Sequence, residues 1–199
     1  MNLNSNKVII DDLNYIKKNC SKELKELAGK RILFTGGAGF LGYYFLQALL
    51  ESDKLYQNKK IKIDVYDNFI RGKKKWLSNL SKKNKGLKLV KKDITKPFLI
   101  KEKYDYIVHA ASIASPTYYR IYPLETIDSN VNGIRNILNY SLKNKNLKGL
   151  LFFSSSEIYG DPDVKNIPTK EDYRGFVSCV GPRACYDESK RLSETLCTI

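Results

Sequence analysis

Short apolar segments alternate with longer amphipathic segments along most of the chain. Between the short segments, apolar residues recur at helical spacing in residues 41–50, 123–143 and 184–196. Strands that alternate with helices in this way predict an α/β fold with a doubly wound parallel sheet and right-handed crossovers. The five predicted strands are rich in branched and aromatic residues: RILF at 31–34, IKIDVY at 61–66, LKLV at 87–90, YDYIVHA at 104–110 and KGLLFFSSS at 148–156.

The first 29 residues differ from the rest of the chain because they are polar and carry no strand pattern. Two short amphipathic helices are predicted there, at residues 11–18 and 22–27. At 199 residues the chain can bury one substantial core, and this length favours a single domain. We therefore expect an N-terminal helical extension over residues 1–29 and one α/β domain over residues 30–199.

A glycine-rich turn, TGGAGFLG at residues 35–42, follows the first predicted strand and opens the first helix of the α/β domain. Gly36, Gly39 and Gly42 permit a tight turn, close approach of a pyrophosphate and close packing of the helix on the strand. Asp67 ends the second strand, where a carboxylate can bind the hydroxyls of an adenosine ribose. The pattern predicts a Rossmann fold that binds NAD rather than NADP, although Arg71 could offset part of the repulsion that Asp67 exerts on the extra phosphate of NADP. The alternative is a glycine-rich turn that binds no ligand.

A tyrosine and a lysine lie four residues apart in the last predicted helix, so Tyr186 and Lys190 share one of its faces. A nearby ammonium group and a positive nicotinamide ring lower the pKa of a phenol, which would suit Tyr186 to accept a proton from a sugar hydroxyl. Ser155 and Glu157 follow the fifth strand, at the edge of the sheet where ligands bind. Ser155 could share the hydrogen bond of that hydroxyl, while Glu157 is either functional or an exposed loop carboxylate.

Six motifs, in the same order along the chain, resemble the extended short-chain dehydrogenases/reductases, the NAD-dependent epimerase/dehydratase family. Within that family, ASIASPTYY at 111–119, EDYRG at 171–175 and the last of the six motifs are most similar to the UDP-glucuronate decarboxylases. The resemblance covers the chain from about Lys30 to Ile199, with Cys179 where the family has proline and Ser155 where it often has threonine. The six motifs are TGGAGFLG at 35–42, DNF at 67–69, DI at 93–94, HAAS at 109–112, SSSEIYGDP at 154–162 and GPRACYDESKR at 181–191.

This resemblance implies a reaction and a set of site residues. NAD would oxidise the C4 hydroxyl of UDP-glucuronate, the resulting β-keto acid would lose carbon dioxide, and the retained NADH would reduce the ketone to give UDP-xylose. Tyr186 would be the base and Lys190 its partner, with Ser155 at the hydroxyl, and Glu157 and Tyr119 at the sugar. The implied cofactor contacts are Gly36, Gly39, Phe40, Leu41, Gly42, Asp67, Asn68, Asp93, Ile94, Ala110, Ala111, Ser112, Asn130, Tyr186 and Lys190.

The residue before Glu157 separates this reaction from its neighbours in the family. Nucleotide-sugar 4,6-dehydratases carry an Asp-Glu pair where this chain has Ser156 and Glu157, and a serine cannot act as the acid that eliminates water. Simple 4-epimerases usually lack the glutamate, so the Ser-Glu pair favours decarboxylation. A 4,6-dehydratase, a 4-epimerase and a non-catalytic NAD-binding module remain the alternatives.

The resemblance also concerns assembly and the end of the chain. It implies a homodimer that pairs through the helices at 123–143 and 184–196. It implies as well a C-terminal domain that supplies most contacts to the UDP-sugar, and this domain would follow the last residue of the present chain. We therefore expect the isolated chain to be inactive, and a separately encoded C-terminal half could complete it.

Charge and composition narrow the choice of partners. The net charge is +14, and lysines concentrate between Lys59 and Lys92, for example at Lys73 to Lys75. Such a charge suits polyanionic ligands such as NAD and a UDP-sugar. A nucleic-acid partner is not favoured, because no known module is visible and the lysines are not interleaved with arginines or base-stacking aromatics other than Trp76.

The remaining sequence features bear on compartment and on the single histidine. No segment is long and apolar enough to span a membrane, which predicts a cytoplasmic protein without membrane partners. Neither a C-x-x-C pair nor a metal-ligand spacing is present, so no metal is expected and the four cysteines are predicted to be reduced and mostly buried. His109 is predicted to pack at a strand end rather than to act as a catalyst.

Overall fold

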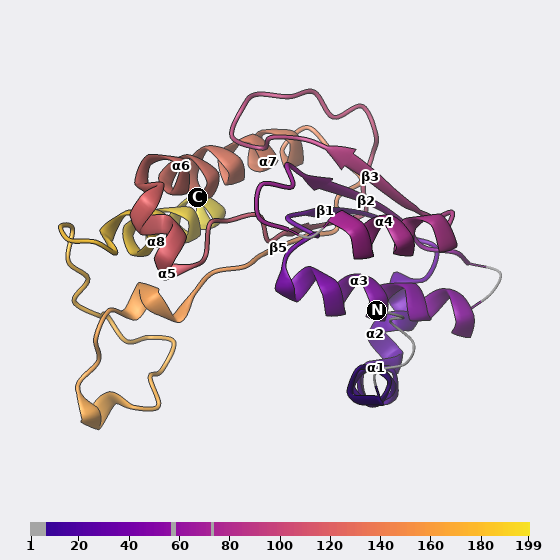
Figure 1. Ribbon diagram of the computed structural model, residues 1–199, viewed down its shortest axis with the longest axis horizontal. Helices are drawn as coiled ribbons and strands as arrows, with labels where there is room; N and C mark the ends of the chain where they lie inside the picture. The colour runs from indigo at the N-terminus through magenta and orange to yellow at the C-terminus, as the bar shows by residue number, and fades with distance from the viewer. Residues whose placement is uncertain (1–6, 57–58, 73) are drawn as a thin grey trace. The chain divides into compact units, whose positions relative to one another are not determined.

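The computed structural model describes residues 7–56, 59–72 and 74–199, and these divide into two compact units (Figure 1). The first, here called the sheet unit, comprises residues 1–92, 102–110 and 146–150. The second, here called the helical unit, comprises residues 93–101, 111–145 and 151–199. The first six residues of the predicted N-terminal extension and Lys73 lie outside the described residues.

The five strands lie in the order β3-β2-β1-β4-β5, which is the strand order of dinucleotide-binding sheets. β1 pairs in parallel with β2 and β4, and β2 pairs in parallel with β3. A parallel sheet with flanking helices confirms the predicted Rossmann-like α/β class. The strands are β1 (Arg31–Thr35), β2 (Lys62–Asp67), β3 (Leu87–Lys91), β4 (Tyr106–His109) and β5 (Gly149–Phe152).

The central strands form the core of the sheet unit because most of their residues are inaccessible to water. Ile32, Leu33 and Phe34 of β1 are at most 1% exposed, a burial expected of parallel strands that are covered on both faces. At the end of β4, His109 is 1% exposed and its Nδ1 lies 2.7 Å from Oγ1 of Thr35. This placement confirms His109 as a packed residue at a strand end.

Four helices among the described residues belong to the sheet unit. α3 (Phe40–Leu55) packs onto β1 through an edge-to-face contact between Phe45 and Phe34, and α4 (Lys74–Lys83) packs on β3. The N-terminal helices α1 (Lys7–Asn19) and α2 (Ser21–Leu27) contact α3, and Lys17 of α1 forms an ion pair with Glu51 of α3. The two predicted N-terminal helices are thus present, and the first is longer than predicted.

In the helical unit, the helix predicted over residues 123–143 is not one regular α-helix. It consists of α6 (Pro123–Ile127), a π-helical turn at Asp128–Asn132 and α7 (Gly133–Ser141). The wide turn leaves the carbonyl of Asn130 open to the hydroxyl of Ser193, which donates to it across 3.0 Å. Ser193 belongs to α8 (Ala184–Thr198), whose bounds agree with the predicted helix over residues 184–196. The short helix α5 (Pro116–Ile121) was not predicted.

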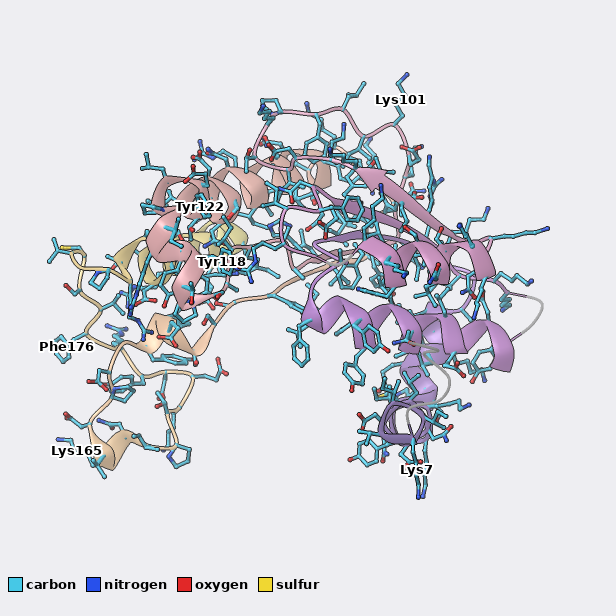
Figure 2. All side chains as sticks on the ribbon, in the orientation of Figure 1. Lys7, Lys101, Tyr118, Tyr122, Lys165 and Phe176 are labelled. Carbon is cyan, nitrogen blue, oxygen red and sulfur yellow. The ribbon has the colours of Figure 1, made fainter. Side chains whose placement is uncertain are left out.

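The segment between β5 and α8 is mostly irregular. The fifth strand ends at Phe152 rather than at Ser156, because the hydroxyl of Ser155 accepts a hydrogen bond from the amide of Glu157 and turns the chain into a 3₁₀ helix at Ser156–Tyr159. A second 3₁₀ helix covers Val164–Asn166. Phe176, in the loop that leads to α8, is 94% exposed and points away from the ribbon (Figure 2).

The structure also bears on the predictions about membrane spans and about the four cysteines. None of the helices in the described ranges has the length and apolar character that crossing a membrane requires. The cysteines are free as predicted, but the prediction that they are mostly buried is wrong. Cys179 and Cys197 are exposed and the other two are partly exposed, because all four lie in or next to surface helices and loops.

Candidate active site

In the sheet unit, the glycine-rich turn runs between β1 and α3. Gly36 has a φ of 74°, which glycine adopts without strain, and its amide donates to the carbonyl of Tyr66 across 2.9 Å. A Cβ atom at Gly42 would lie 2.3 Å from the carbonyl oxygen of Gly37, so only glycine lets the first turn of α3 approach the loop this closely. A Cβ at Gly39 would meet only the carbonyl oxygen of Gly36, at 3.3 Å. Beyond this one tight contact, no described atom outside the neighbouring residues lies within 4 Å of that Cβ position.

This loop fits the pyrophosphate of a dinucleotide. The N–H groups in the first turn of a helix have no acceptor within the helix, and they attract an anion. Phe40 and Leu41 form that turn in α3 and their side chains are 80% and 53% exposed, so they leave its N-terminal end accessible. Gly39, which directly precedes Phe40, adjoins the same turn.

Asp67 ends β2 and binds two backbone amides, which the sequence did not predict. One of its carboxylate oxygens accepts a hydrogen bond from the amide of Ala38 at 2.9 Å, and the other accepts one from the amide of Phe69 at 2.7 Å. The side chain is nearly buried, at 9% exposure for the residue. Asp67 thus fixes the glycine-rich turn, and each of its oxygens retains acceptor capacity for a ribose hydroxyl.

The residues after Asp67 lie against the same turn. Asn68 accepts a hydrogen bond from the amide of Ile70 at 3.1 Å, and Phe69 has a φ of 59°. A Cβ at Gly72 would lie 2.3 Å from Cβ of Ala38, so the chain passes directly over the glycine-rich turn at this point. The predicted adenosine-binding residues Asp67 and Asn68 therefore border the predicted pyrophosphate loop.

We predict that the chain binds NAD at least about tenfold more tightly than NADP. The carboxylate of Asp67 would repel the extra phosphate of NADP, and Arg71, which is exposed, offsets only part of that repulsion. Titration of the chain with each cofactor, followed by calorimetry, measures the ratio of dissociation constants. Arg71→Ala should widen the preference for NAD, and equal affinities in the unsubstituted chain would contradict the assignment of Asp67.

In the helical unit, Tyr186 lies in the first turns of α8. The residue is 6% exposed, and its ring stacks on that of Tyr119, with 5.1 Å between ring centroids. Burial raises the pKa of Tyr186 above its ordinary value, while a hydrogen bond with Ser155 lowers it. The lowered pKa predicted for Tyr186 concerns the cofactor-bound site, where a nicotinamide ring adds positive charge, and it stays a prediction.

Lys190 lies one helical turn after Tyr186 and is 3% exposed. Its ammonium group donates a hydrogen bond to the carbonyl of Phe153 at 2.6 Å and lies 5.8 Å from the centroid of the Tyr186 ring. Burial lowers the pKa of Lys190 to about 8. The predicted Tyr186, Lys190 and Ser155 are therefore brought together, with the lysine bound to the segment that carries Ser155.

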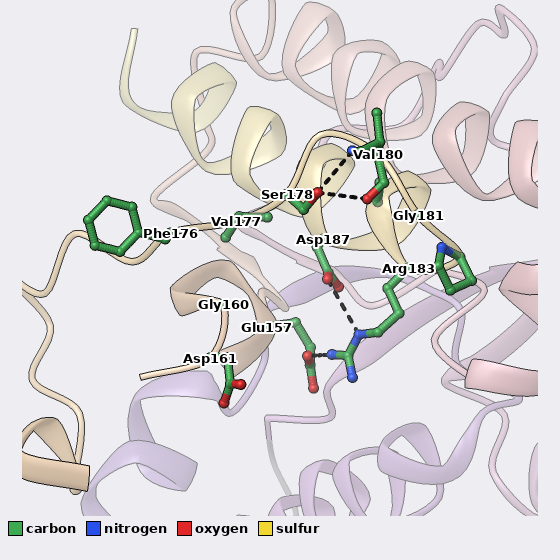
Figure 3. Close-up of a pocket in the computed structure, with 12 residues that line it drawn as sticks. Glu157, Gly160, Asp161, Phe176, Val177, Ser178, Val180, Gly181, Arg183 and Asp187 are labelled. Atoms are coloured by element: carbon green, nitrogen blue, oxygen red, sulfur yellow. Dashed lines mark hydrogen bonds and ion pairs between the residues drawn. The ribbon is translucent and has the colours of Figure 1, made fainter. Parts of the chain in front are cut away.

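Glu157 is partly exposed and forms an ion pair with Arg183, the residue before α8 (Figure 3). The same guanidinium contacts Asp187 of α8 at 3.5 Å. These three side chains line a cavity of about 490 Å³ together with residues 176–178 and 180–182. Sequence reasoning missed Arg183 and Asp187, although their spacing of four residues at a helix start was a readable signal for an ion pair.

The other predicted cofactor residues divide between the two units. In the sheet unit, the amide of Ala110 donates to the carbonyl of Thr35 at 3.0 Å. In the helical unit, which also contains Ala111, the buried Asn130 accepts from the hydroxyl of Ser112 and donates to the hydroxyl of Ser189. Asp93 accepts two hydrogen bonds from Thr95, and Ile94 is 6% exposed.

Residues 32–199 match the family model described as the NAD dependent epimerase/dehydratase family. The chain belongs to this family. The match covers both the glycine-rich turn of the sheet unit and the Tyr-Lys pair of the helical unit. It confirms the predicted family and, because the family is NAD dependent, the predicted cofactor.

Individual members of the epimerase/dehydratase family show the same relationship. UDP-glucuronic acid decarboxylase 1 of Danio rerio is 41% identical over 180 residues, which are 88% of this chain and 39% of that protein. UDP-glucuronic acid decarboxylase 6 of Arabidopsis thaliana is 41% identical over 83% of this chain and 45% of that protein. The chain thus spans less than half the length of these curated relatives.

A solved structure in the epimerase/dehydratase family has a similar fold. The UDP-N-acetylglucosamine 4-epimerase from Methanobrevibacter ruminantium M1, in complex with UDP-N-acetylmuramic acid, matches with a TM-score of 0.70 and 28% identity. The match covers 86% of this chain and 50% of the epimerase. The chain therefore shares the fold of this nucleotide-sugar enzyme.

Proposed function

We propose that the chain carries the cofactor-binding and proton-transfer residues of a UDP-glucuronate decarboxylase, which forms UDP-xylose and carbon dioxide. The observation that carries the proposal is the 41% identity with UDP-glucuronic acid decarboxylases over 83–88% of the chain, set against 28% identity with the 4-epimerase structure. The proposal includes NAD on the glycine-rich turn and Asp67, and a UDP-sugar as substrate.

The proton-transfer residues would act in the following way. Tyr186 accepts the proton of the C4 hydroxyl, and Ser155, which is hydrogen-bonded to Tyr186, shares the hydrogen bond of that hydroxyl. Tyr186 has its pKa raised by burial, so a nearby positive charge is needed to stabilise the phenolate. The Lys190 ammonium, 5.8 Å from the ring centroid, supplies such a charge while it is protonated, which requires a pH below about 8.

The carboxylate leaves because of the ketone formed beside it. NAD, when bound, would supply reversible hydride transfer, with a hydride removed from C4 in the oxidation and the same hydride returned to C4 in the reduction. With a ketone at C4, the C5–C6 bond breaks, the carboxylate leaves as carbon dioxide and the electron pair passes to the C4 oxygen. Protonation at C5 and reduction at C4 then complete the change to xylose. Glu157, a carboxylate beside the proposed sugar position, is suited to orient hydroxyl groups of the ring.

Ser156 makes the 4,6-dehydratase reaction a poor fit. That reaction expels a hydroxyl group from C6, and the departing oxygen needs a proton from an acid. Ser156 is exposed and carries a hydroxyl whose pKa is far too high for this task. The proposal therefore predicts no 4-keto-6-deoxy product.

The experiment that tests this function joins the chain to the part of the Danio rerio decarboxylase that follows its matched segment. The fusion is incubated with UDP-glucuronate and NAD, and products are identified by mass spectrometry. UDP-xylose with carbon dioxide supports the proposal. A second candidate, a 4-epimerase, is favoured by the epimerase structure, and a product of unchanged mass with inverted C4 would establish it instead. NAD binding without turnover of any UDP-sugar would favour a non-catalytic module.

We propose further that the protein forms a homodimer through α6, α7 and α8. Leu124 of α6 and Leu192 of α8 are 72% and 46% exposed, and an apolar surface of this kind favours association. Sedimentation velocity at micromolar concentration should give the mass of a dimer, and Leu124→Glu should shift it to that of a monomer. Val164→Glu, which changes an 88% exposed residue of the irregular segment, is the matched control and should leave the dimer intact.

A further inference from the structure

Three basic side chains from α8 and the residue before it bind the segment that contains Ser155 and Glu157. Lys190 donates to the carbonyl of Phe153, and Arg191 donates to the carbonyl of Ile158 across 3.0 Å. Arg183 forms the third attachment, through the carboxylate of Glu157 (Figure 3). The segment 153–158 is thus attached to α8 and the residue before it at its first residue and at its last two residues.

The Arg183 attachment differs from the other two because it joins side chains. Backbone carbonyls are present whatever the sequence, whereas the bond to Glu157 holds the functional group itself. The guanidinium also contacts Asp187, whose neighbour Tyr186 hydrogen-bonds Ser155. Arg183 therefore bridges the carboxylate of Glu157 and the helical turn that presents Tyr186.

Burial of Asp187 strengthens its ion pair with Arg183. Asp187 is 8% exposed, and its Oδ1 atom is buried without a hydrogen-bond partner among the described residues. Burial raises the pKa of Asp187, and the Arg183 guanidinium opposes that rise. Loss of Arg183 would leave a buried carboxylate with no compensating cation, which is costly, so Asp187 keeps the guanidinium in place.

We propose that Arg183 is a positioning residue, which holds Glu157 and the turn of Ser155 in register with Tyr186 by bridging Glu157 to Asp187. A planar guanidinium can engage two carboxylates at once, whereas an ammonium group is a point charge that cannot fix both in one plane. When Glu157 turns to a sugar hydroxyl, Arg183 keeps its contact with Asp187, so the buried carboxylate of Asp187 is not left without a cation. The catalytic importance of this bridge rests on the proposed function, whereas its existence does not.

The bridge is tested in the full chain by amide hydrogen exchange and mass spectrometry. The reporters are the amides of Glu157, Ile158 and Gly160, which donate to acceptors within residues 155–157 and sit in the turn that the bridge fixes. Arg183→Gln should speed their exchange on the order of tenfold, and Glu157→Gln should do so by a similar factor. The double variant should exchange no faster than either single variant, because both substitutions remove the same contact.

Two further variants make this test specific. Arg183→Lys should slow amide exchange only part of the way back to that of the unsubstituted chain. Lysine keeps the positive charge but lacks the planar guanidinium that donates to two carboxylates at once. Arg120→Gln, which changes an exposed arginine on α5 of the same unit, is the control and should leave exchange at residues 157–160 unchanged. Far-ultraviolet circular dichroism identifies any variant that fails to fold, and Glu157→Gln, which changes a partly exposed loop residue, then tests the same contact alone. Unchanged exchange in Arg183→Gln or Glu157→Gln, or additive effects in the double variant, would overturn the proposal.

The catalytic consequence is measured separately in the fusion that tests the proposed function. Arg183→Gln should lower kcat about ten- to a hundredfold while the dissociation constant of NAD stays the same. If the bridge is confirmed by exchange and the unsubstituted fusion has no activity on any UDP-sugar, the proposed function fails and the bridge stands. If the fusion is active and Arg183→Gln retains full kcat, the positioning role is refuted.

Discussion

Replacement of Tyr186 by phenylalanine is expected to lower the rate of carbon dioxide release from UDP-glucuronate by about a hundredfold to ten-thousandfold, the usual cost of losing a general base. The substitution keeps the ring that stacks on Tyr119 and removes only the hydroxyl that hydrogen-bonds Ser155. The fold should therefore persist. The rate is measured in the fusion with the Danio rerio C-terminal part, with labelled carboxylate in the substrate.

Two controls define this result. NAD affinity of Tyr186→Phe should stay within a few-fold of the unsubstituted protein, since the glycine-rich turn and Asp67 are untouched. Tyr118→Phe removes a hydroxyl from α5, in a tyrosine that is 39% exposed and next to the stacked Tyr119, and should leave the rate unchanged. An unchanged rate in Tyr186→Phe would refute the catalytic assignment, whatever the substrate.

The second large effect is expected for Gly39→Val, which should weaken NAD binding by roughly a hundredfold or more. The backbone at Gly39 does not have the positive φ that excludes other residues, and a Cβ there meets only the carbonyl oxygen of Gly36. The chain should therefore keep its fold, with a local shift of a few tenths of an ångström at the carbonyl of Gly36. The valine side chain would extend beside the first turn of α3, where we expect the pyrophosphate to lie. Calorimetric titration with NAD measures the loss.

Gly42→Ala is the matched variant, because it should affect stability rather than the cofactor directly. Its Cβ would lie 2.3 Å from the carbonyl oxygen of Gly37, so α3 must move away from the glycine-rich turn. Such overpacking typically costs about 1–3 kcal/mol in the free energy of unfolding. Denaturant unfolding should therefore show a lower free energy of unfolding for Gly42→Ala, whereas Gly39→Val should mainly weaken NAD binding. Full NAD affinity in folded Gly39→Val would contradict the assignment of this turn to the pyrophosphate.

Periodicity in the sequence was sufficient for the five strands and for α3 and α8, because buried parallel strands and amphipathic helices have distinct apolar patterns. It failed where side-chain hydrogen bonds override the pattern. The fifth strand ends early because the Ser155 hydroxyl caps a turn, and the helix over residues 123–143 contains a π-helical turn that serves a bond between Asn130 and Ser193. The spacing of apolar residues predicts neither of these hydrogen bonds.

The sequence by itself determined the fold class, the glycine-rich turn, the acid at Asp67 and the Tyr186–Lys190 pair, since each depends on local spacing that the backbone geometry of strands and helices fixes. Only the tertiary structure decided how these groups are held. It gave Asp67 two amide donors, attached Lys190 to the carbonyl of Phe153 and placed Arg183 between Glu157 and Asp187. The contact of Arg183 with Glu157 spans 26 positions and that of Lys190 with Phe153 spans 37, so both depend on how the chain packs, and no local pattern encodes them.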